Sequence, residues 1–103
     1  MPSSVLDYPF LYAHLTESTQ LTTAKGTLHT VTINRGDAHA AGVITIYDSA
    51  DGVDADNIIA ILIMDTAVFV IPQTLIYDIN YVNGLYLDFD EDFTTADITV
   101  SYR

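Results

Sequence analysis

Apolar and polar side chains alternate at every second position through much of this chain. Leu85, Leu87 and Phe89 share one parity, and tyrosine or aspartate fills the positions between them. Ile98 and Val100 repeat the pattern at the C-terminal end. A period of two is that of a β-strand with one buried face, whereas an amphipathic helix repeats every 3.6 residues. The alternation therefore predicts an all-β protein.

Short segments with this alternation recur along the chain and are separated by Gly, Asp and Asn clusters that favour turns. They lie at residues 10–16, 19–23, 26–34, 42–47, 57–64, 67–71, 75–81, 84–90 and 97–103. Eight or nine short strands in 103 residues predict an antiparallel β-sandwich of the jelly-roll or Ig-like kind. Within the third segment, the parity places His29 on the same face as Val31 and Ile33.

Two of the predicted strands are apolar on both faces. In residues 57–64, Ile58, Ala60 and Leu62 share one face, and isoleucine occupies the other. Because a strand in a two-layer sandwich meets the core with one face only, the second face needs another cover. Residues 67–71 present the same problem. We expect an oligomer or partner interface there, formed by Ile59, Ile61, Ile63, Val68 and Val70.

The N-terminal segment of the chain is the alternative cover for the second apolar face of residues 57–64. Residues 1–9 carry two prolines and predict an extended N-terminal arm, whereas residues 10–103 predict a single domain. The arm could fold over the second face of the strand. Its contacts would then come from Val5, Leu6, Tyr8 and Phe10. Of the two covers, a second copy of the chain is favoured, and a symmetric ring or trimer would suit repetitive assembly.

The charge limits the partners. Fourteen acidic residues against three basic ones give a formal net charge of −11, and no basic patch is present. Such a field opposes binding to nucleic acid and to anionic lipid. The apolar stretch at residues 58–76 is interrupted by Asp65, Pro72 and Gln73, which favours two strands over a membrane span.

Catalytic motifs are not apparent in the sequence. The three histidines, His14, His29 and His39, share no metal-ligand spacing, and the chain has no cysteine, no nucleophile elbow and no phosphate-binding glycine loop. We therefore expect a protein that is not an enzyme and that needs no cofactor. A small enzyme remains a rival hypothesis, because aspartates are plentiful enough to supply a carboxylate pair.

The acidic loop at residues 48–57 is the best candidate for a metal site. Oxygen ligands at this density can gather Ca²⁺, although the spacing does not match an EF-hand. A second acidic cluster at residues 88–92 also departs from that pattern. A solvated acidic rim is the favoured interpretation of both. The weak calcium ligands would be Asp48, Asp51, Asp54 and Asp56.

The order of four segments resembles that of small β-sandwich virion proteins of tailed bacteriophages, of the capsid decoration, cement or head-fibre type. The segments are residues 26–34, 43–48, 83–87 and 97–103. The resemblance implies a structural protein, often a homotrimer, that is made in the host cytoplasm and stabilises the capsid lattice from outside. Its partners would be itself and the major capsid protein. The alternative is a receptor- or carbohydrate-binding module of a tail fibre or cell-surface protein.

Overall fold

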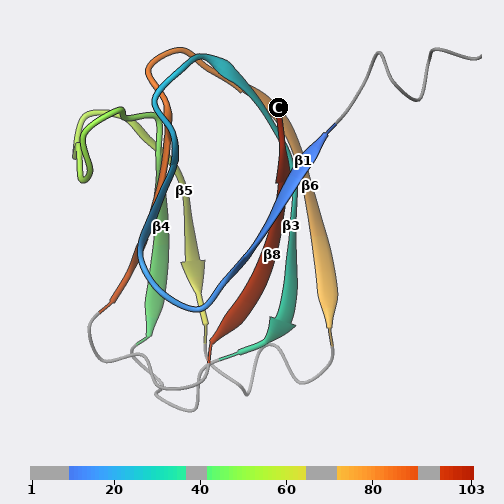
Figure 1. Cartoon of the computed structure of the whole chain (residues 1–103). Helices are drawn as coiled ribbons and strands as arrows, with labels where there is room; N and C mark the ends of the chain where they lie inside the picture. The colour runs from blue at the N-terminus through green and yellow to red at the C-terminus, as the bar shows by residue number, and fades with distance from the viewer. Residues whose placement is uncertain (1–9, 37–41, 65–71, 91–95) are drawn as a thin grey trace, which may run out of the picture.

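The computed structural model describes residues 10–36, 42–64, 72–90 and 96–103, which form two packed β-sheets (Figure 1). Sheet A has the strand order β1-β8-β3-β6, and sheet B has the order β2-β7-β4-β5. All pairs are antiparallel, as expected. The strands are β1 (Leu11–Leu15), β2 (Thr19–Thr22), β3 (Gly26–Arg35), β4 (Val43–Tyr47), β5 (Ile58–Ile63), β6 (Gln73–Tyr81), β7 (Leu85–Phe89) and β8 (Asp97–Tyr102).

The pairing is nested, and this identifies the kind of sandwich. β4 pairs with β5, β3 with β6, β2 with β7 and β1 with β8, as if one long hairpin were rolled into two layers. Eight strands wound in this way make a jelly roll. An Ig-like sandwich would instead place the first and second strands side by side in one sheet. Of the two expected architectures, the chain therefore adopts the jelly roll.

The core lies between the two sheets and is built from the alternating positions. Leu85, Leu87 and Phe89 on β7 are buried, as the parity predicted, and so are Ile98 and Val100 on β8. The remaining fully buried side chains are Leu28, Val31, Ile33, Ile44, Ile46, Met64 and Tyr81. Among the described residues, no buried side-chain nitrogen or oxygen lacks a hydrogen-bond partner, so the core carries no polar penalty.

The predicted position of His29 is wrong. The pairing of β3 with β6 and with β8 shifts between Leu28 and Thr30, so a β-bulge interrupts the alternation at this residue. Its ring stacks on Phe10 and its Nδ1 contacts Asp78, which has a left-handed backbone with φ of 50°. A bulge changes the face of the side chains that follow it. The side chain of His29 therefore lies on the outer face of sheet A, while Val31 and Ile33 remain in the core.

The turn between β6 and β7 packs closely against two other segments. A Cβ atom at Gly84 would lie 2.5 Å from the carbonyl oxygen of Thr22 and 2.7 Å from that of Ser49, and the backbone φ of 155° is also one that side chains disfavour. Only glycine fits at this position between β6 and β7. None of the described residues belongs to a helix that could cross a membrane.

Candidate functional site

The outer face of β5 carries a row of exposed isoleucines. Ile58, Ile61 and Ile63 have exposed fractions of 45%, 58% and 59%. The strand lies at the edge of sheet B, next to β4. Leu62 and Met64 point the other way and are buried in the core. The two-faced character of this segment, which the sequence indicated, therefore leaves one apolar face uncovered by any described residue.

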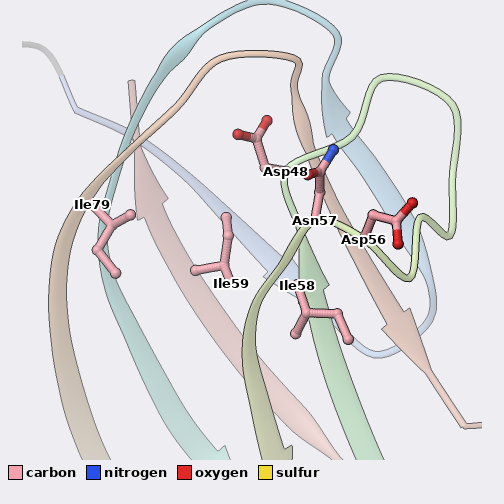
Figure 2. Close-up of a pocket in the computed structure, with 6 residues that line it drawn as sticks. All are labelled: Asp48, Asp56, Asn57, Ile58, Ile59 and Ile79. Atoms are coloured by element: carbon pink, nitrogen blue, oxygen red, sulfur yellow. The ribbon is translucent and has the colours of Figure 1, made fainter.

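The composition of this row differs from the prediction at one position. The register between β4 and β5 shifts so that Ile46 pairs with Ala60 and Tyr47 with Ile58, which places Ile59 in a bulge. Its side chain is partly buried and packs against the core. Figure 2 shows Ile58 and Ile59 on opposite sides of the β5 ribbon. Ile58 thus takes the place expected for Ile59, and we call the row of Ile58, Ile61 and Ile63 the β5 face.

A hollow of about 370 Å³ lies beside the start of β5. It opens between the edge strands of the two sheets, with Ile59 contributed by β5 and Ile79 by β6 (Figure 2). Asp48, Asp56 and Asn57 form its polar rim, and Ile58 completes the lining. The hollow is therefore lined by three isoleucines and three polar residues, two of them carboxylates.

The carboxylate of Asp48 is engaged within the fold. It accepts backbone N–H bonds from Val82 at 3.0 Å, Asn83 at 2.8 Å and Gly84 at 3.4 Å. These bonds fasten the β6–β7 turn to the end of β4, in the way that a carboxylate caps a helix or a turn. A residue predicted as a weak calcium ligand thus has backbone hydrogen-bond donors at both of its carboxylate oxygens.

The other three candidate calcium ligands do not converge with Asp48. Asp54 accepts bonds from the backbone of Asp56 and the side chain of Asn57, and Asp51 bonds to Ser49. Across the described ranges, which include all four aspartates, no group of three or more metal-ligating side chains occurs. The carboxylates of Asp51 and Asp54 are thus engaged within the turns of the loop.

Charge is distributed unequally between the two sheets. Where sheet B and its 48–57 loop are described, their charged side chains are all carboxylates, with Asp88 on β7 and the loop aspartates as examples. The three cations lie instead at sheet A, on or beside β3 and β8: Lys25, Arg35 and Arg103. The β5 face is therefore an apolar row in an acidic neighbourhood.

The remaining predicted contacts divide into two groups. Phe10 directly precedes β1 and stacks on His29, with ring centroids 4.4 Å apart. The guanidinium of Arg103 lies 5.1 Å from the centre of the Phe10 ring. Phe10 packs on the outer face of sheet A and not against β5. The other predicted interface or arm residues lie outside the described residues: Val5, Leu6, Tyr8, Val68 and Val70.

The outer face of sheet A is mostly polar and internally bonded, although Tyr12 and Ile76 are also exposed on it. His14 Nε2 lies 2.7 Å from Asp97 Oδ1, which also accepts a bond of 2.9 Å from Asn34. Thr32 and Thr74 bond across β3 and β6 at 3.0 Å. Each pair joins neighbouring strands, so the polar groups of this face satisfy one another as well as meeting water.

Two tyrosines on β6 have perturbed ionisation. Burial raises the pKa of the Tyr77 phenol above 10.0. Burial also raises the pKa of Tyr81, with smaller contributions from Tyr102 and Asp48. The hydroxyl of Tyr81 donates to the carbonyl oxygen of Arg103 at 3.0 Å. Both side chains face the core, which indicates a packing role.

Together these features define a small jelly-roll protein with one apolar, acid-flanked edge strand. Comparisons of the chain with protein-family models, with curated proteins and with solved structures find no match. Its function therefore has to be inferred from the β5 face and the fold.

Proposed function

We propose that this protein is a structural part of a larger assembly that is held by its β5 face. The observation that carries the proposal is the alignment of Ile58, Ile61 and Ile63 on an edge strand. Burying one isoleucine side chain contributes about 1.5–3 kcal/mol, so a row of three is a substantial source of binding free energy. In soluble proteins, contiguous exposed apolar side chains mark interaction sites.

Within that class, a capsid decoration or cement protein of a tailed bacteriophage is the function we favour. The jelly roll is a common fold of viral capsid domains, although lectins also use it. The acidic surface suits a protein that works outside the capsid, away from the packaged nucleic acid. In this role the chain would associate with itself and dock on the major capsid protein.

The receptor- or carbohydrate-binding alternative has less support. A module of that kind would need an exposed aromatic cluster or a calcium site in the 48–57 loop. The loop carboxylates bond mainly within the protein, and Tyr12, at 80% exposure, stands on a polar face. Binding to glycans or to Ca²⁺ by isothermal titration would revive this alternative.

Co-sedimentation tests the favoured function. Capsids assembled from the major capsid protein of the same genome are mixed with the purified chain and pelleted. We expect the wild-type protein and the control variant Ile76→Asp to pellet, because Ile76 lies on β6, away from the β5 face. Ile61→Asp should stay in the supernatant. Wild-type protein that remains in the supernatant would contradict the capsid role.

A further inference from the structure

The edge of β5 differs from the other three edges of the sandwich. Natural sheets protect their edge strands with charged residues, prolines or bulges, because unpaired backbone groups invite another strand. β2 is mostly polar, β1 contains His14, and β6 contains Asp78 within its bulge. β5 reads Ile-Ile-Ala-Ile-Leu-Ile and, after the bulge at Ile59, has none of these protections.

The hydrogen-bond pattern shows which backbone groups face that edge. The N–H of Met64 donates to the carbonyl of Gly42 at 2.9 Å, so Met64 directs its backbone groups toward β4. In an antiparallel pair, bonded positions alternate with positions whose groups point away. With the observed register, Leu62 and Ala60 also bond to β4. The N–H and C=O groups of Ile61 and Ile63 therefore point to the open edge, where no described residue meets them.

We propose that a second copy of this chain adds to this edge, with the two β5 strands antiparallel and a two-fold axis at Leu62. The inference rests on the proposed function and specifies how the copies associate. Ile61 then lies opposite the partner's Ile63, and the pair exchanges both backbone hydrogen bonds. Because the axis repeats the contact, the partner's Ile61 pairs with Ile63 in the same way.

The antiparallel arrangement also suits the charge. The acidic 48–57 loop precedes β5, so the two-fold axis sends the loops of the two copies to opposite ends of the paired strands. Asp56 lies six positions from Leu62, and at about 3.3 Å per residue the two Asp56 side chains are roughly 40 Å apart. Repulsion over that distance is screened at physiological salt, where the Debye length is about 8 Å. Parallel pairing would instead bring the acidic loops together.

Cysteine cross-linking tests the register directly, because the chain has no natural cysteine. Opposite residues in a bonded antiparallel pair have Cα atoms about 5.5 Å apart, within the range that a disulfide can span. The variants Ile61→Cys and Ile63→Cys are oxidised separately and as an equimolar mixture. We expect disulfide-linked dimers in the mixture. Either variant alone should form few of them, because the two copies of one position are diagonal neighbours across the paired strands and not opposite each other. Ile76→Cys serves as the exposed control on the other sheet.

Light scattering of the full-length wild-type chain separates the possible outcomes. The proposal predicts twice the monomer mass of 11.3 kDa. A trimer, or a dimer whose cross-links ignore the predicted pairs, would overturn edge pairing and leave the proposed assembly role standing. A monomer whose Ile61→Cys thiol reacts slowly with a labelling reagent would show that the chain covers its own edge. That result would overturn edge pairing, whereas capsid co-sedimentation would still decide the assembly role.

Discussion

On the outer face of sheet A, polar side chains bond to one another across the strands. On the outer face of sheet B, the edge strand β5 presents only isoleucine. Ile76 on sheet A is 71% exposed, more than any member of the β5 face. Yet its neighbours two positions away along β6 are the polar residues Thr74 and Asp78. Only one other isoleucine of β6, Ile79, is exposed. The two faces therefore differ in the continuity of isoleucine along an unprotected edge, and not in the exposure of any one side chain.

The largest expected effect is on self-association. Ile61→Asp places a carboxylate at the centre of the β5 face in both copies, with the loss of about 2 kcal/mol of burial in each. We expect the dissociation constant of the dimer to rise at least about 100-fold. Analytical ultracentrifugation measures the change. Ile76→Asp should leave the constant unaltered, and an equal loss from both variants would remove the distinction between the faces.

A carboxylate at position 59 should lower the stability of the folded chain instead of weakening its self-association. Ile59 packs against the core, so Ile59→Asp brings a carboxylate into a partly buried apolar site. We expect the free energy of unfolding to fall by about 2 kcal/mol. Urea denaturation measures it at a protein concentration where both variants are monomeric. Ile61→Asp is the matched control and should change stability by less than about 0.5 kcal/mol.

A substitution on the outer face of sheet A should lower the stability of the fold and leave self-association unchanged. Asp97→Ala removes the shared partner of His14 and Asn34, and a hydrogen bond of this kind contributes about 1 kcal/mol. We expect a loss of about 1 kcal/mol in urea denaturation with no change in the mass from light scattering. Asp56→Ala, in the exposed acidic loop, provides the control for the loss of a carboxylate. A change of oligomer mass in Asp97→Ala would mean that sheet A also takes part in assembly.

Salt should strengthen the association of two identical acidic chains. Each copy carries a formal charge of −11, and screening reduces their mutual repulsion. We expect the dimer dissociation constant to fall several-fold between about 50 mM and 500 mM NaCl. Association that weakens over this range would indicate that the two copies meet through oppositely charged groups and not through the β5 edge.

The smallest effect concerns the tyrosines on the inner side of β6. Because burial raises the pKa of Tyr77 and Tyr81, the folded protein favours the neutral phenols, while the unfolded chain ionises near 10.0. Their contribution to stability is therefore complete below pH 10 and is lost as the pH rises through the folded-state pKa. Denaturation between pH 9 and 11 should show this decline. Tyr81→Phe should reduce its slope, and an unchanged slope would contradict the assignment.

The sequence predicted the strands well because alternation depends on each strand's own burial. Leu87 and Val100 face the core as their parity required. The errors at His29 and Ile59 both arise at bulges, where one extra residue reverses the parity. A bulge depends on the register with a neighbouring strand, and no local pattern specifies that register.

The candidate site was partly predictable for the same reason. Ile61 and Ile63 were identified from a strand that is apolar on both faces, but its position at a sheet edge depends on the strand order. The role of Asp48 was also missed, because its partners lie more than thirty positions along the chain, as in the pair with Asn83 at a sequence separation of 35. An aspartate directly after a strand is only a weak sequence signal for hydrogen bonds to a turn so far along the chain.

The nested pairing of strands also bears on how the chain folds. The outermost pair joins residues as far apart as Leu11 and Tyr102, 91 positions along the sequence, and loop closure over such distances slows folding. The innermost hairpin, β4 with β5, closes the shortest loop and can form before its neighbours arrive. The unprotected isoleucine strand would then be presented to other nascent chains early. Expression at low temperature and low chain concentration should therefore improve the soluble yield.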